Sequence, residues 1–172
     1  MTANEKAFLD MIAWSEGTST IKESDNGYNV IVGGALFESY ADHPRKLVVL
    51  NKKGLKSTAA GRYQLLSRYF DAYKKRLKLP DFSPVSQDTI AMQQIRECKA
   101  LDDINAGRLS AAIQKCARIW ASLPGNNYAQ HQNAGNVLQA AYLRAGGTVV
   151  EREGHCQYTC KAKTTGVIPH KT

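Results

Sequence analysis

Near the start of the chain, apolar residues recur every three or four positions, at Phe8, Leu9, Ile12 and Ala13. This spacing places them on one face of a helix. Thr2 and Glu5 have the spacing of a capping box, which predicts where the helix begins. Gly17 and the polar residues after it predict where the helix ends, so that Glu16 falls in its last turn.

A β-rich segment follows, with a Gly33-Gly34 pair in its middle. Residues 28–32 and 35–40 flank this pair and predict a hairpin closed by a two-residue turn. The Leu-Val-Val-Leu run at residues 47–50 predicts a third strand. A small sheet is therefore expected after the first helix.

Helical spacing returns from residue 59 onward, carried by Tyr63, Leu66, Phe70 and Tyr73. Ser83 before Pro84 predicts the N-cap and the first position of another helix. Three helices are predicted, punctuated by glycine and proline, over about residues 84–104, 108–122 and 134–145. These elements predict an α+β fold, a mostly helical body with one small sheet.

Apolar periodicity ends after Val150, which predicts one domain over residues 1–150 and a flexible C-terminal tail over residues 151–172. The apolar fraction of 43% excludes a disordered polyelectrolyte. No apolar run is long enough for a membrane span, and the charged first residues do not resemble a signal peptide. The sequence therefore predicts a soluble protein made in the cytosol.

The formal net charge is +8, and seven of the basic residues lie between residues 43 and 70 without an acidic neighbour. They are Arg45, Lys46, Lys52, Lys53, Lys56, Arg62 and Arg68. Such an excess favours a polyanionic partner, which includes nucleic acid, anionic lipid and the acid-bearing bacterial cell wall. Charge alone does not choose among these partners.

The cysteines are too few for a disulfide scaffold. Cys98 and Cys116 each continue an apolar helical stripe, which favours core residues and leaves a bridge between two neighbouring helices as the alternative. Four zinc ligands can be drawn in the tail, at His155, Cys156, Cys160 and His170. Their spacing matches no common closed zinc site, so no metal site is predicted.

Glu16 has the position of a general acid. A carboxylate in the last turn of a helix faces the negative end of the helix dipole, and the neighbouring Trp14 is able to desolvate it. Both effects raise a carboxylate pKa toward the range that suits proton donation. The alternative is a solvated residue at a helix end.

Several short sequence blocks place Glu16 in a wider context: residues 6–11 (KAFLDM), 13–18 (AWSEGT), 30–34 (VIVGG), 42–47 (DHPRKL), 55–58 (LKST), 60–67 (AGRYQLLS), 81–84 (DFSP) and 119–125 (IWASLPG). In this order they resemble the phage lambda endolysin family of peptidoglycan-cleaving lytic transglycosylases. The resemblance spans residues 6 to about 150, and the tail has no counterpart in it.

The resemblance implies a lysozyme-like fold in which a small antiparallel sheet flanks the active-site cleft beside a mostly helical lobe. It also implies a single catalytic acid, which falls on Glu16, and no metal or organic cofactor. Glu16 would protonate the glycosidic oxygen of N-acetylmuramic acid and then take the proton of its C6 hydroxyl. The product would carry a 1,6-anhydro ring.

A hydrolase would instead need a second carboxylate. Candidates after the first helix are Glu23, Asp25, Glu38 and Asp42. Asp25 is the best of them, because it lies nine residues after Glu16, a spacing that resembles the acid pair of phage T4-type lysozymes. The Thr that follows in that pattern is Val30 here, so Asp25 is interpreted as a solvated loop residue.

Substrate contacts are predicted in two places. Residues 61–64 resemble the G-x-Y-Q element of lytic transglycosylases. The Tyr63 ring is expected to pack on a sugar ring, and the Gln64 amide is expected to form hydrogen bonds with the sugar. Their expected place is the start of a helix at the cleft edge. Tyr128 and Gln130 follow in a polar loop whose family counterpart flanks the cleft.

The expected partner is the glycan strand of peptidoglycan, bound by a monomer that associates stably with neither nucleic acid nor membrane. The resemblance implies storage in the host cytoplasm and release to the periplasm and cell wall through a holin pore at lysis. A basic cell-wall or nucleic-acid binding module without catalytic activity is the remaining alternative, because it predicts the same charged segment.

Overall fold

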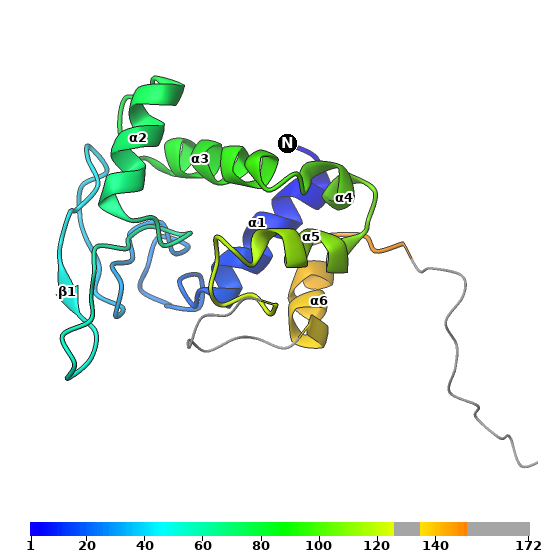
Figure 1. The fold of residues 1–172 in the computed structure, drawn as a ribbon, viewed down its shortest axis with the longest axis horizontal. Helices are drawn as coiled ribbons and strands as arrows, with labels where there is room; N and C mark the ends of the chain where they lie inside the picture. The colour runs from blue at the N-terminus through cyan, green and yellow to red at the C-terminus, as the bar shows by residue number, and fades with distance from the viewer. Residues whose placement is uncertain (126–134, 151–172) are drawn as a thin grey trace, which may run out of the picture.

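The computed structural model describes residues 1–125 and 135–150, which contain six helices and one two-stranded antiparallel sheet (Figure 1). The elements are α1 (Ala3–Ser15), β1 (Val48–Val49), β2 (Lys56–Ser57), α2 (Ser67–Leu77), α3 (Pro84–Glu97), α4 (Leu101–Asn105), α5 (Leu109–Cys116) and α6 (Gly135–Arg144). In Figure 1, α2 and the sheet lie at one end, α1, α4, α5 and α6 cluster at the other, and α3 runs between them. The predicted α+β class is confirmed.

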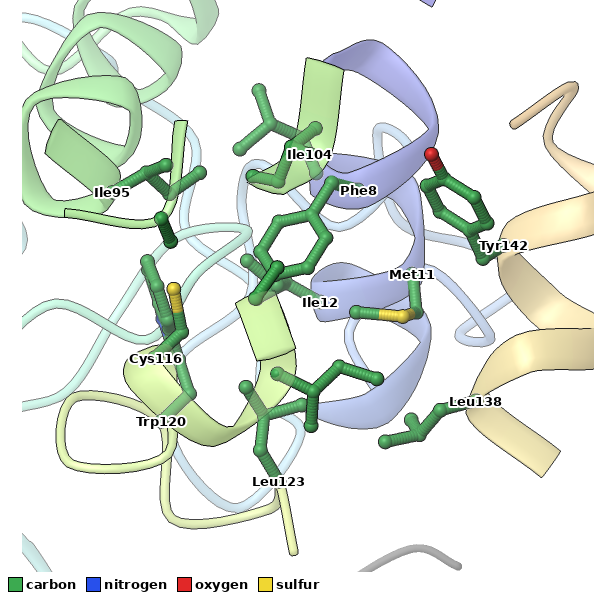
Figure 2. Close-up of a cluster of buried hydrophobic side chains, with 14 of the residues drawn as sticks. Phe8, Met11, Ile12, Ile95, Ile104, Cys116, Trp120, Leu123, Leu138 and Tyr142 are labelled. Carbon is green, nitrogen blue, oxygen red and sulfur yellow. The ribbon is translucent and has the colours of Figure 1, made fainter. Parts of the chain in front are cut away.

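Helix α1 is the centre of the helical cluster, and its start is fixed locally. The Thr2 hydroxyl accepts a hydrogen bond from Glu5 N–H at 3.1 Å, and the Glu5 carboxylate accepts one from Thr2 N–H at 3.0 Å. This is the predicted capping box. Figure 2 shows Phe8, Met11 and Ile12 of α1 packed among side chains from the other helices. Burying one such side chain contributes about 1.5–3 kcal/mol.

The β-rich region is less regular than predicted. Residues 28–40 reverse direction around Gly33-Gly34 as expected, but the turn spans residues 32–34 and not two residues, because Ile31 N–H donates to the Ala35 carbonyl oxygen at 2.7 Å. The flanking residues form one bridge, Val30 with Leu36, in place of two strands. Ile31 pairs instead with Ala60, from a segment much later in the chain. The prediction of a strand within 47–50 is confirmed by β1, whose Val48 and Val49 pair with Ser57 and Lys56 of β2.

Three helix boundaries differ from the prediction. Residues 59–66 form a loop, and α2 begins only at Ser67. The helix predicted over 84–104 is two helices, because Lys99 adopts a left-handed conformation with φ of 57° between α3 and α4. Helix α5 ends at Cys116, where turns replace the predicted helical residues up to 122. The N-cap at Ser83 and the Pro84 start are confirmed.

A second apolar cluster secures the sheet end of the molecule. It contains Ala60, Leu65, Phe70, Phe82 and Ile90. The buried His43 ring packs on two of these rings, with its centroid 4.9 Å from that of Phe82 and 5.8 Å from that of Phe70. Its Nδ1 accepts from Arg45 N–H, and its Nε2 lies 2.8 Å from the carbonyl oxygen of Leu65. The loop of residues 59–66 is thereby fastened to α2 and α3.

Cys98 and Cys116 are buried free thiols in the apolar cluster around α1, called the main core below, which agrees with their interpretation as core residues. Across residues 1–125 and 135–150, no helix is long and apolar enough to cross a membrane. The same residues contain no group of His, Cys, Asp or Glu side chains that would hold a metal ion. The tail residues His155, Cys156, Cys160 and His170 lie outside the described part of the chain.

Candidate active site

Glu16 lies at the C-terminal end of α1, where the helix stops. Its N–H still donates to the Ile12 carbonyl oxygen at 2.8 Å, and Gly17 then turns the chain with a φ of 79°. Only glycine adopts that conformation without strain. The predicted position of Glu16 at the helix end is therefore correct.

The Glu16 carboxyl is partly buried and held by a residue far away in the sequence. The Ser122 hydroxyl donates to Glu16 Oε1 at 2.7 Å. Burial raises the pKa of Glu16, because desolvation disfavours the charged form, while the Ser122 hydroxyl and N–H act in the opposite direction. Burial is the larger effect, so the carboxyl keeps its proton to a higher pH than an exposed glutamate does. This property suits a general acid.

The candidate second carboxylates lie in different surroundings. Asp25 is exposed, and its Oδ2 accepts a hydrogen bond of 2.6 Å from the Tyr40 hydroxyl. Asp42 is paired with Arg45 at 2.8 Å. Glu23 and Glu38 are exposed. None of the four shares the burial of Glu16.

The Gly61–Gln64 segment belongs to a loop, so its predicted place at the start of a helix is wrong. Tyr63 is only 6% exposed, and its hydroxyl donates to Asp88 Oδ1 at 2.6 Å. Burial raises the pKa of Tyr63, and the negative charge of Asp88 adds to the effect. The carbonyl oxygen of Tyr63 accepts from Trp120 Nε1 at 3.1 Å. Tyr63 thus joins the loop to α3 and to the segment that carries Ser122.

Gln64 is the member of this segment that remains partly exposed. It adopts a left-handed conformation with φ of 53°, and its Nε2 donates to the carbonyl oxygens of Gly61 at 2.9 Å and Val30 at 3.3 Å. Within residues 1–125 and 135–150, its Oε1 has no hydrogen-bond partner. The fixed amide therefore offers an acceptor to a bound molecule.

Gln64 also lines a groove with a volume of about 430 Å³. Its walls come from residues 63–66, from the first turns of α2 and from residues 118–121. Tyr69 is 47% exposed on this wall, and Arg68 and Arg118 add positive charge. Tyrosine rings and guanidinium groups are able to contact sugar rings and acidic substituents.

The basic segment of residues 43–70 is less charged than its composition suggests. Arg45 lies between Asp42 and Asp71, at 2.8 Å and 2.5 Å from their carboxylate oxygens. Arg62 is buried and bonds Asp10 at 2.8 Å. The four lysines remain exposed. The acidic partners come from outside the segment, so the composition of the segment alone overstated its charge.

Ser122 and Asp88 were not predicted as site residues. Ser122 lies in the IWASLPG block, which marked it as part of the resemblance, but nothing local indicates that its hydroxyl reaches a residue 106 positions away. The same holds for Asp88, which is a polar position on α3. Tyr128 and Gln130 lie outside the described residues.

Comparison with known proteins matches this chain to one family throughout its domain. The family model described as Endolysin matches residues 6–149. The endolysin of Escherichia phage lambda is 59% identical over 148 residues, which are 85% of this chain and 93% of the relative. The endolysin of Escherichia phage P2 is 50% identical, with 84% and 93% covered.

Solved structures agree with the sequence relatives. Bacteriophage lambda lysozyme in complex with a chitohexasaccharide is similar with a TM-score of 0.84 and 56% identity, over 87% of this chain and 98% of that one. A second structure of lysozyme from bacteriophage lambda has a TM-score of 0.81 and 55% identity, with the same coverage. The lysozyme-like fold is therefore confirmed, and this chain belongs to the endolysin family.

Proposed function

We propose that this endolysin, a cell-wall-degrading enzyme of the lambda and P2 type, is a lytic transglycosylase with Glu16 as its single catalytic residue. Its substrate is the β-1,4 bond between N-acetylmuramic acid and N-acetylglucosamine of peptidoglycan. The observation that carries the proposal is the Glu16 carboxyl, partly buried, raised in pKa and held through one oxygen by Ser122. Such a carboxyl is able to act first as a protonated acid and then, once ionised, as a base.

In the first step the protonated Glu16 donates its proton to the glycosidic oxygen, and the bond from that oxygen to C1 of N-acetylmuramic acid breaks. In the second step the C6 hydroxyl of the same sugar attacks C1 and gives its proton to the ionised Glu16. The acid is thereby restored, and the sugar leaves as a 1,6-anhydro ring. Because the nucleophile belongs to the substrate, no second carboxylate and no cofactor are needed.

The glycan partner is supported by the related lambda lysozyme, whose structure contains a chitohexasaccharide, a β-1,4-linked chain of N-acetylglucosamine. In this chain Gln64 offers its amide oxygen to the substrate. Tyr63 acts mainly by holding the Gln64 loop, since its ring is 6% exposed and its hydroxyl is engaged by Asp88. Tyr128 and Gln130 stay predicted contacts. We further propose a monomer that a holin pore releases from the host cytoplasm to the cell wall.

The chemical nature of the products distinguishes this proposal from hydrolysis. Digestion of purified peptidoglycan is expected to release muropeptides that end in 1,6-anhydromuramic acid, each lighter by one water than the product with a reducing end. Mass spectrometry of the released fragments measures this difference directly. Fragments with reducing ends would establish a hydrolase, and the absence of fragments would point to a binding module.

Replacement of Asp25 by Asn is expected to leave turnover unchanged within about two-fold, because the transglycosylase uses no second carboxylate. The assay is the initial rate of peptidoglycan digestion at neutral pH. A loss of tenfold or more, of about 1.4 kcal/mol in the activation barrier, would favour the hydrolase with Glu16 and Asp25 as its acid pair.

Replacement of Gln64 by Ala is expected to raise KM about tenfold, because one hydrogen bond from its Oε1 to the glycan is lost. The value of kcat is expected to change less, since the amide takes no part in proton transfer. Both constants are measured on a soluble glycan fragment. A lower Tm with KM unchanged would show that the amide serves only the carbonyl oxygens of Val30 and Gly61.

A further inference from the structure

A chain of two hydroxyl groups leads to the Glu16 carboxyl. The Ser15 hydroxyl donates to Ser122 Oγ at 2.9 Å, and the Ser122 hydroxyl donates to Glu16 Oε1 at 2.7 Å. Ser15 is the last residue of α1 and is 9% exposed. These two bonds run from a buried hydroxyl group to one oxygen of the carboxyl.

The direction of these hydrogen bonds follows from the number of protons. Each serine hydroxyl has a single proton to donate. Ser122 gives its proton to Glu16 Oε1, so its oxygen is left to accept the proton of Ser15. Successive hydroxyl groups that point the same way polarise one another, which strengthens the last bond of the chain. Glu16 Oε1 is thereby kept as an acceptor.

Packing holds Ser122 in the place that this chain needs. Trp120 and Leu123, which lie two residues before it and one residue after it, are 3% and 0% exposed in the main core. Trp120 is also fixed by its bond to the Tyr63 carbonyl oxygen, and Leu123 N–H donates to the Trp120 carbonyl oxygen at 3.0 Å. The short turn between two core residues leaves the Ser122 hydroxyl little freedom to move away from Glu16.

We propose that Ser122 is a positioning residue and that the chain from Ser15 through Ser122 keeps Glu16 Oε1 as an acceptor, so that the transferable proton resides on Oε2. This inference rests on the proposed function of Glu16 as the acid. Without the chain, the carboxyl is free to rotate and to hold its proton on either oxygen. With the chain, Oε1 accepts from the Ser122 hydroxyl, and the proton occupies the other oxygen.

The first test follows the titration of Glu16 itself, independently of activity. Protein labelled with ¹³C in its glutamate carboxyl groups is titrated by NMR, and the Glu16 signal is assigned by its absence in Glu16→Gln. In Ser122→Ala the pKa of Glu16 is expected to rise, because a donor to the ionised form is lost. Ser15→Ala is expected to cause a smaller rise, and Ser110→Ala, an exposed serine on α5, none.

The second test follows catalysis with the same variants. In Ser122→Ala we expect kcat to fall about tenfold with KM unchanged, and the alkaline limb of the kcat profile to move to higher pH. Ser122→Thr keeps a hydroxyl group and is expected to restore both. A purely structural role of Ser122 would lower Tm without moving the pH limb.

The titration tests the hydroxyl chain, and the kinetics test the role of Glu16 as the catalytic acid. An unchanged Glu16 titration in Ser122→Ala would overturn the hydroxyl chain, whatever the rates. A titration that moves as expected while the pH limb stays in place would show that Glu16 is not the acid of the reaction. That result would overturn the proposed function, and with it the catalytic role of Ser122.

Discussion

Replacing Glu16 with Gln is expected to lower the rate of peptidoglycan cleavage by about 10²- to 10⁴-fold. Glutamine has nearly the same shape and can still accept from the Ser122 hydroxyl, but its amide donates no proton to a leaving oxygen. The loss should therefore appear in kcat, with binding of glycan fragments retained. Mass spectrometry of the released products measures the loss of cleavage, and calorimetry measures whether binding of glycan fragments is retained.

The same variant should be at least as stable as the parent at neutral pH. Burial raises the pKa of Glu16 above its ordinary value of 4.5, so the folded state binds the proton more tightly than the unfolded state. The free energy of unfolding then falls as the pH rises from 4.5 through the folded pKa. Glutamine does not titrate. The Tm of Glu16→Gln relative to the parent should therefore increase across this window.

Asp102→Asn is the matched control, because it makes the same carboxylate-to-amide change at an exposed position of α4. Its activity should follow that of the parent. A Glu16→Gln enzyme that still cleaves peptidoglycan at a tenth of the parental rate would contradict the role of Glu16. A Tm difference that shrinks with rising pH would contradict a raised pKa.

The sequence predicted those features that depend on near neighbours. The capping box of Thr2 and Glu5 and the Ser83-Pro84 start of α3 were correct, because their hydrogen bonds lie within one helical turn. The reversal of the chain at Gly33-Gly34 was also predicted, although the turn has three residues and not two. The helix-end position of Glu16 was predicted correctly, but its contact with Ser122 depends on a residue far away in the sequence.

What the sequence did not predict depends on distant partners. Residues 63–73 have helical apolar spacing, yet residues 59–66 are a loop, because Gly61 N–H donates to the Val30 carbonyl oxygen and Arg62 N–H to Gln87 Oε1. These bonds replace the ones that a helix would make. Gly61 has no space for a side chain, since an added Cβ would lie 2.5 Å from Gln87 Oε1.

Arg62 is the central residue of that loop, and Arg62→Met is expected to lower the free energy of unfolding by about 3–5 kcal/mol. Its guanidinium is buried and donates to Asp10 at 2.8 Å, to the Asn26 carbonyl oxygen at 3.0 Å and to the Tyr63 hydroxyl at 3.1 Å. Methionine fills part of the volume but leaves these acceptors without their donor. Urea unfolding followed by circular dichroism measures the change.

Arg68→Met is the matched control, since Arg68 lies in the first turn of α2 and is exposed, with its guanidinium 4.9 Å from the centroid of the Tyr69 ring. It should cost less than about 1 kcal/mol. Equal losses for the two variants would mean that the buried Arg62 contacts contribute no more than a surface arginine does. The expected difference would show that the loop of residues 59–66 depends on the buried guanidinium of Arg62. The Tyr63 carbonyl oxygen of this loop accepts from Trp120, which helps to position Ser122. The position of Ser122 would therefore depend on Arg62 as well.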